Sequence, residues 1–218
     1  MRTKILSGVL VAAGILLLAY PHLSAWYYDR QQQQLVNRWQ EAFATVQLPV
    51  QSEAEQHPAA DYAEDLLEEG ESNDAPYPER KAVQLGLDME GMLYIDKIDL
   101  ELPILTGATE QNLKTTAASI ADTGKPGEVG NYAIAGHRNH AYGRNFNRLD
   151  ELAEGDAIEV DTGNQVFRYE VTEKLYVEPH EVWVLEPEGT KQEITLVTCH
   201  PIDTGTHRLI VKGILIET

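Results

Sequence analysis

The longer, C-terminal part of the chain alternates short apolar runs with short stretches of turn residues. The turn signals at 123–127 and 161–164 both contain glycine, the first together with proline and the second with asparagine. Many short strands joined by such turns favour an all-β sandwich or barrel. In this part of the chain, only residues 110–118 have the pattern of a helix. The predicted strands are residues 91–98, 100–105, 132–135, 157–160, 166–171, 194–198 and 209–216.

The beginning of the chain has a different pattern. Residues 5–28 are almost entirely apolar and carry no formal charge when His22 is neutral. A run of this length spans a hydrocarbon core of about 30 Å, and Trp26 near its end suits the membrane interface. We therefore expect residues 1–28 to form one uncleaved transmembrane helix. A cleaved secretory signal is the alternative, although residues 23–25 make a poor cleavage site.

Residues 29–82 predict a spacer followed by a linker. Leu35 and Trp39 have helical spacing, which indicates a short juxtamembrane helix that we interpret as a spacer. Residues 51–79 are rich in carboxylates and contain no Lys or Arg. Such a segment buries too little apolar surface to offset its chain entropy, so we expect a flexible linker, with a calcium-binding or partner-binding tail as the alternative. Residues 83–218 then have the size of one domain.

The charge of the chain narrows the classes of partner. Asp and Glu number 35 against 17 Lys and Arg, which gives a formal net charge of −18. Proteins that bind nucleic acid use basic patches to neutralise phosphates, so this composition argues against a nucleic-acid partner. No stretch of the sequence reads as a loop that cradles phosphate.

The candidate chemistry centres on Cys199, which is the only cysteine and therefore cannot form an internal disulfide. It follows the predicted strand 194–198. Arg208 opens the next strand after a short loop, so the two strands should pair antiparallel and bring the thiol and the guanidinium to neighbouring strand ends. His137 stands where the predicted strand 132–135 ends.

These three side chains have complementary chemistry. A cysteine attacks an amide only as the thiolate, which a nearby cation favours. The imidazole of His137 can give a proton to a leaving amine and take one from an incoming nucleophile. Arg208 does not deprotonate, so its expected role is to donate hydrogen bonds to an oxyanion or to the substrate backbone.

Each of these residues also has a structural interpretation. An isolated cysteine is ordinarily a small buried hydrophobe, and an isolated arginine is ordinarily a surface cation. Cys199, His137, His200 and His207 could together ligate zinc, but neighbours on a strand point to opposite faces and no paired-ligand spacing is present. The same alternation argues against His200 and His207 as the proton carrier. The other histidines that compete with His137 for this role are His140 and His180.

The ordered set of motifs resembles the sortases, which are membrane-anchored cysteine transpeptidases of mainly Gram-positive bacteria. The matching stretches are 134–137, with the sequence Ile-Ala-Gly-His, 195–199, with the sequence Thr-Leu-Val-Thr-Cys, and Arg208. The resemblance implies a closed β-barrel of about eight strands with short helices. It also implies that the catalytic domain lies on the extracytoplasmic side of the cell membrane.

The resemblance further implies an activity. Cys199 would attack the carbonyl after threonine in a C-terminal sorting signal like Leu-Pro-x-Thr-Gly or Leu-Pro-x-Thr-Ala and form a thioester. His137 would be the general acid and base, and Arg208 would stabilise the oxyanion or the substrate. An amine of a peptidoglycan precursor would then attack the thioester, so that the secreted protein becomes joined to the cell wall. The alternatives are a sortase that polymerises pilins, a peptidoglycan transpeptidase with a catalytic cysteine, and a non-catalytic membrane-tethered β-barrel that binds a partner.

Subclass and substrate contacts also follow from the resemblance. The sequence Thr198 to Pro201 looks most like class D, with class E as the close competitor, and no lid motif of the pilus-building class C appears around Asp61. The loop 176–191 is expected to hold the Leu and Pro of the signal. No cofactor is expected, and a calcium site among the glutamates of this loop is not indicated. The expected substrate-binding residues are Thr198, Val182, Trp183, Val184 and Leu185.

Overall fold

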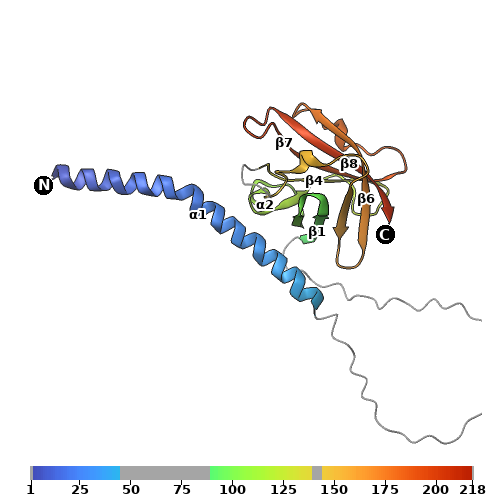
Figure 1. The fold of residues 1–218 in the computed structure, drawn as a ribbon, viewed down its shortest axis with the longest axis horizontal. Helices are drawn as coiled ribbons and strands as arrows, with labels where there is room; N and C mark the ends of the chain where they lie inside the picture. Colours follow the sequence, from blue (N-terminus) through green and yellow to red (C-terminus); the bar gives the residue numbers. More distant parts are fainter. Residues whose placement is uncertain (1, 45–88, 139–143, 218) are drawn as a thin grey trace, which may run out of the picture.

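The computed structural model describes residues 2–44, 89–138 and 144–217 and shows a long helix beside a β-barrel (Figure 1). The acidic linker 51–79, the domain boundary at 83 and His140 lie outside the described residues. The elements are α1 (Arg2–Ala44), β1 (Met89–Ile95), η2 (Asp96–Ile98), β2 (Leu100–Leu105), α2 (Glu110–Thr115), β3 (Ala117–Ser119), β4 (Gly130–Ala135), η3 (Leu149–Glu151), β5 (Ala157–Asp161), β6 (Val166–Val177), η4 (Val182–Leu185), β7 (Gln192–His200) and β8 (His207–Glu217).

The strands close into a single barrel in the order β1-β2-β3-β4-β7-β8-β6-β5, with β5 pairing back to β1. Most neighbours are antiparallel, but β2 pairs with β3 and β4 pairs with β7 in parallel. Closure removes the unpaired edges that an open sheet would expose. The expected closed barrel of about eight strands is therefore confirmed.

Two predicted elements are partly wrong. The strand expected over 91–98 ends at Ile95, and residues 96–98 form the 3-10 helix η2. The helix expected over 110–118 ends at Thr115, and Ala117 and Ala118 belong to the short strand β3. Alanine favours helices intrinsically, which explains the prediction. Both alanines are fully buried where β3 pairs with β2 on one side and β4 on the other, and this tertiary packing overrides the helix propensity.

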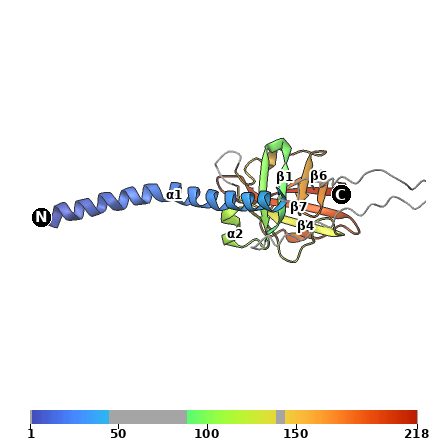
Figure 2. The same cartoon turned by 90° about the horizontal axis from the view of Figure 1, so that it is seen from below.

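The C-terminal half of α1 packs against the barrel instead of standing free as a spacer (Figure 2). Leu35 and Trp39 are only 6% and 4% exposed. Leu35 packs with Leu105 of β2 and Ala118 of β3, while Trp39 shares a side-chain hydrogen bond with Tyr94 of β1. The sequence showed only the helical spacing of Leu35 and Trp39, and in the structure these two residues form an interface between α1 and the barrel.

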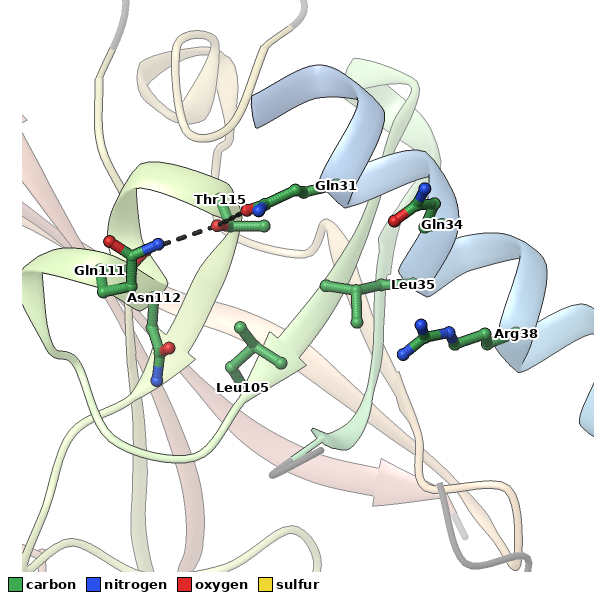
Figure 3. A pocket seen from close by; sticks show the side chains of 8 residues that line it. All are labelled: Gln31, Gln34, Leu35, Arg38, Leu105, Gln111, Asn112 and Thr115. Carbon is green, nitrogen blue, oxygen red and sulfur yellow. Dashed lines mark hydrogen bonds between the residues drawn. The ribbon is translucent and has the colours of Figure 1, made fainter. Parts of the chain in front are cut away.

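Polar contacts extend this interface toward α2. The Arg144 guanidinium lies 3.0 Å from the Asp29 carboxylate, and the Thr115 hydroxyl donates to the Gln31 side-chain oxygen at 3.2 Å. A cavity of about 270 Å³ remains between α1, α2 and β2 (Figure 3). Its lining residues are Gln31, Gln34, Leu35, Arg38, Leu105, Gln111, Asn112 and Thr115.

The apolar run 5–28 lies entirely within α1, with Pro21 inside the helix. In the part of the chain that the structure describes, no helix combines the length and the apolarity that a membrane crossing requires.

Candidate active site

Cys199 and Arg208 are direct partners in the antiparallel ladder between β7 and β8. Directly opposed residues of such a pair share one face of the sheet, so the thiol and the guanidinium lie on the same face. Both are partly exposed. The short loop and antiparallel pairing expected from the sequence are thus confirmed.

The loop between the two strands fixes the Arg208 side chain. The Nη1 atom donates to the carbonyl of Gly205 and to that of His207, both at 3.0 Å. Gly205 has a φ of +58°, a conformation that glycine adopts at little cost. A Cβ at this position would lie 3.8 Å from the Cys199 sulfur, so the loop passes directly beside the thiol.

His137 reaches the same place from the other neighbour of β7. Strand β4 pairs with β7 in parallel up to Ala135 opposite Val197, and the Gly136 N–H continues the ladder by donating to the Val197 carbonyl at 3.1 Å. Two residues beyond Ala135 in this register, His137 falls beside Cys199. Adjacent strands lie about 4.8 Å apart. Cys199 and Arg208 are thus paired across β7 and β8, and His137 follows the end of β4, which is the other neighbour of β7.

Thr198 links the end of β7 to the residue that follows β4. Its hydroxyl donates to the Gly136 carbonyl at 2.7 Å, and the residue is 2% exposed. The structure therefore shows Thr198 in a contact within the barrel, and the expected substrate contact of Thr198 stays a prediction.

The environment of His137 lowers its pKa below the usual value of 6.5. Partial burial of the ring is the largest cause, because it disfavours the charged form. The positive charge of Lys114 adds to the effect, while the carboxylate of Glu110 opposes it. These two residues form an ion pair on α2. His137 is therefore mainly neutral at neutral pH and ready to accept a proton.

Helix η4 covers β6, β7 and β8 on the sheet that carries Cys199 and Arg208. Its residues differ in accessibility. Val184 is 3% exposed and packs with Val177 and Ile210, and Leu185 packs against the same cluster. Val182 and Trp183 are 64% and 49% exposed. Val184 and Leu185 therefore attach η4 to the barrel, whereas Val182 and Trp183 face solvent, and the substrate contacts expected of η4 stay a prediction.

The competing histidines that the structure describes have other contacts. His200 accepts a hydrogen bond from Arg138 at 2.8 Å, since a guanidinium only donates. His207 contacts the Thr206 hydroxyl at 3.0 Å, and His180 lies near Glu178. Within the described residues, no three His, Cys, Asp or Glu side chains are grouped so that they hold a metal ion. The zinc-site alternative therefore gains no support.

Sequence reasoning missed several residues of this site. Glu110 and Lys114 influence His137 from α2, and Gly205 supports Arg208 from the loop. Arg138 directly follows His137 but carried no signal beyond its position in the sequence. The spacing of Glu110 and Lys114 indicates an ion pair on a helix, but it does not reveal that the helix lies near His137.

A comparison with protein families places these motifs in a known domain. The family described as "Sortase domain" matches residues 93–216, a span that contains His137, Cys199 and Arg208. Sortase A of Bacillus anthracis is 37% identical over 128 residues, covering 59% of this chain and 60% of the relative. Sortase SrtE1 of Streptomyces coelicolor is 33% identical over 58% of this chain and 40% of its own length. Sortase D of Bacillus subtilis is 29% identical over 56% of this chain and 62% of its own length.

Solved structures give the same result. A Clostridium perfringens sortase D5 transpeptidase has a TM-score of 0.55 at 35% identity, covering 60% of this chain and 80% of that one. A Clostridium perfringens sortase C with the C-terminal cell wall sorting motif has a TM-score of 0.57 at 28% identity, covering 60% of this chain and 72% of that one. Because this chain spans only 40 to 62% of the length of the three relatives named above, the similarity concerns the domain.

Proposed function

Because the chain belongs to the sortase family, we propose that it is a cysteine transpeptidase that cleaves a sorting signal and transfers the released protein to an amine. The observation that carries this proposal is the direct pairing of Cys199 with Arg208 across β7 and β8, with His137 two residues beyond the end of β4, the other neighbour of β7. A nucleophile, a proton carrier and a fixed cation are the parts that amide transfer through a thioester needs.

The first half of the reaction breaks the peptide bond. His137, held neutral by its surroundings, takes the thiol proton, and the sulfur of Cys199 attacks the carbonyl carbon after threonine. Negative charge develops on the carbonyl oxygen, and Arg208 donates hydrogen bonds to it. The C–N bond then breaks while His137 gives its proton to the departing amine. The products are a thioester on Cys199 and a free C-terminal peptide.

The second half reverses these roles. The acceptor amine attacks the thioester carbonyl, and His137 takes its proton as the new C–N bond forms. The C–S bond breaks and Cys199 leaves as the thiolate. The acceptor proposed here is the amine of a peptidoglycan precursor, so that the secreted protein becomes attached to the cell wall.

The proposed substrate is a secreted protein with a C-terminal signal like Leu-Pro-x-Thr-Gly or Leu-Pro-x-Thr-Ala. The similar sortase C of Clostridium perfringens was solved with the C-terminal cell wall sorting motif, which supports this class of substrate. Exposed Val182 and Trp183 stand beside the sheet that carries Cys199 and offer apolar surface to the Leu and Pro of the signal.

The subclass proposed is D, with E as the alternative. The motif Thr198 to Pro201 supports class D, as does the sortase D5 relative, although relatives of classes A, C and E are also similar. We favour wall anchoring over pilin polymerisation, because the sequence around Asp61 has no lid motif of the pilus-building class C.

A membrane location is part of the proposal. The N-terminal part of α1 leaves apolar side chains uncovered, with Leu16, Leu17 and Leu18 between 67% and 77% exposed. Exposed apolar surface of this kind marks a membrane or partner contact. The barrel would then be tethered through residues 1–28 on the extracytoplasmic side. Recovery of the full chain in the membrane fraction after an alkaline wash supports the tether, and complete release by that wash argues against it.

The proposed reaction uses no resident cofactor, because thiol, imidazole and guanidinium supply each step. We therefore expect chelation of divalent cations to leave the turnover of the full chain unchanged. A loss of turnover that calcium restores would overturn this part of the proposal.

The test of the proposed function is a transfer assay. The full chain is incubated with Leu-Pro-x-Thr-Gly and Leu-Pro-x-Thr-Ala peptides and an excess of a glycine oligomer, and products are identified by mass spectrometry. We expect cleavage after threonine and a new peptide joined to the glycine oligomer. A folded chain with a reduced thiol that yields neither product contradicts the proposal, while substitution by Cys199→Ala provides the background.

A further inference from the structure

Arg138, the residue after His137, points into the protein and is only 7% exposed at its side chain. Its guanidinium is fixed in three directions. Nε donates to the Asn147 carbonyl at 3.2 Å, Nη2 lies 2.8 Å from the Asp150 carboxylate, and Nη1 donates to Nδ1 of His200 at 2.8 Å. Asp150 balances the charge that burial would otherwise make costly.

The hydrogen bond from Arg138 to His200 joins the residue after His137 to the residue after Cys199. Extending the parallel register of β4 and β7 beyond its last pair, Ala135 with Val197, places His137 beside Cys199 and Arg138 beside His200, and the hydrogen bond between Arg138 and His200 agrees with this placement. Side chains at successive positions of a strand point to opposite faces. The His200 ring therefore lies on the face of β7 opposite the Cys199 thiol, and the Arg138 bond joins the two strands from behind.

His200 is held from a second side as well. The ring of Tyr176 on β6 lies 4.4 Å from the imidazole of His200, centroid to centroid, with an angle of 55° between the planes. Since the guanidinium donates to Nδ1, a neutral His200 carries its proton on Nε2. The imidazole of His200 thus contacts both Arg138 and Tyr176, and these contacts hold the end of β7 in place.

The backbone ladder between β4 and β7 ends just before His137, so the side-chain bond from Arg138 to His200 is an additional link between the two strands beyond this end. The last regular pair of β4 and β7 is Ala135 with Val197, and beyond it the strands are joined by bonds of Gly136 to Val197 and Thr198. His137 lies past these bonds. A displacement of about 1 Å between reacting groups costs on the order of 100-fold in rate, so a device that holds this end has a kinetic effect.

We propose that Arg138 is a positioning residue that, by binding His200, sets the separation of His137 and Cys199. This inference rests on the proposed function for its kinetic readout. Arg138 touches neither the substrate nor the thiol in this account, and it acts by joining the residue after the proton carrier to the residue after the nucleophile.

The kinetic test uses the full chain with Arg138→Gln, Arg138→Lys, His200→Phe and the double variant Arg138→Gln with His200→Phe. For Arg138→Gln we expect kcat to fall about 10- to 100-fold with KM within about twofold of the parent. Arg138→Lys should recover little of this loss in kcat, because a single ammonium group cannot make the three contacts that the planar guanidinium makes. The double variant should be no more than about threefold slower than the slower single variant.

Arg148 provides the matched control. It is 14% exposed at its side chain and pairs with Glu151, and its Nη1 donates to the Ile98 carbonyl at 2.9 Å. Arg148→Gln removes a comparably buried and bonded arginine from the same segment, so it should lower the melting temperature and leave kcat within about twofold. Unchanged kcat in Arg138→Gln, or losses that multiply in the double variant, would overturn the proposal.

A second readout needs no peptide substrate. The rate of Cys199 alkylation by iodoacetamide is measured against pH for the parent, His137→Ala, Arg138→Gln and Arg148→Gln. We expect the Arg138→Gln profile to move toward that of His137→Ala and the Arg148→Gln profile to match the parent. If peptide transfer fails for the parent, this profile still decides the role of Arg138: a profile that superimposes on the parent overturns it.

Discussion

Cys199 and Arg208 stand directly opposite each other in the antiparallel ladder of β7 and β8, on one face of the sheet. The pairing fixes the separation of their backbones, and the loop between the two strands holds the Arg208 side chain through the Gly205 carbonyl. Hydrogen bonds from Arg208 to the carbonyls of Gly205 and His207 use only one of its three guanidinium nitrogens. The guanidinium is thus held in place while other donors remain for an oxyanion.

Replacing Arg208 tests this role. Arg208→Gln keeps a hydrogen-bond donor but removes the charge, and we expect kcat for peptide cleavage to fall about 100-fold or more. Arg208→Lys should recover little, since lysine lacks the planar fork. Cleavage rates by chromatography, with melting temperatures as the folding control, check this prediction. Retention of kcat within about threefold in a folded Arg208→Gln would show that the charge is dispensable.

The pKa of His137 should respond to α2 in opposite directions. Lys114→Gln removes a positive charge and should raise the pKa of His137, whereas Glu110→Gln removes a negative charge and should lower it further. NMR titration of His137 in the Cys199→Ala background measures both shifts without coupling to the thiol. Burial is the largest cause of the lowered pKa and remains in both variants, so neither should restore the full value of 6.5. Shifts of the same sign would contradict the assignment.

The lowered pKa of His137 also has a consequence for stability. Protonation is harder in the folded chain than in the unfolded one, so the unfolded state binds more protons as the pH falls below about 6.5. The contribution of His137 to stability is therefore full above that pH and declines as the medium becomes acidic. Urea unfolding between about pH 7 and pH 5 should show a shallower decline for His137→Gln than for the parent. Equal slopes would argue against the shift.

Gly136 is expected to tolerate no side chain. A Cβ there would lie 2.6 Å from the ring of Phe146, which is fully buried. Gly136→Ala should therefore destabilise the fold by about 1–3 kcal/mol, the usual cost of overpacking a core. The double variant Gly136→Ala with Phe146→Leu makes room for the methyl group and should recover part of the melting temperature that Gly136→Ala loses. A single variant as stable as the parent would show that the ring moves freely.

The interface between α1 and the barrel predicts unequal roles for two tryptophans of that helix. Trp39 is 4% exposed, and Trp39→Ala should cost about 2–4 kcal/mol in the free energy of unfolding. Trp26 is 57% exposed, and Trp26→Ala should cost no more than about 0.5 kcal/mol. Chemical denaturation of the full chain measures both. Equal effects of the two substitutions would mean that α1 does not pack on the barrel in solution.

The strands were predictable because their signals are local. The alternation and turn residues around β5 and the loop before Arg208 predicted the fold class and the antiparallel pairing. Ala117 and Ala118 were assigned to the wrong element because their small side chains favour a helix in isolation, whereas the barrel buries them in a strand. Tertiary packing decides such residues, and a single sequence does not contain it.

The candidate site divides in a similar way. His137, Cys199 and Arg208 were recognisable from residue type and order, and the barrel pairs Cys199 with Arg208 and ends β4 two residues before His137. Val184 carried the same apolar signal as Val182, but its burial depends on which face of the short helix η4 meets the sheet. Arg138 gave no signal at all, because its partners lie far away in the sequence.

The most direct test of the central claim is the intact mass of the full chain after brief incubation with a Leu-Pro-x-Thr-Gly peptide. We predict an adduct with the mass of the acyl fragment that ends in threonine, abolished by Cys199→Ala and removed by hydroxylamine. His137→Ala and Arg208→Ala should form this adduct much more slowly. An adduct that persists without Cys199, or a folded and reduced chain that forms none with either sorting-signal peptide, would contradict the assignment of Cys199 as the nucleophile.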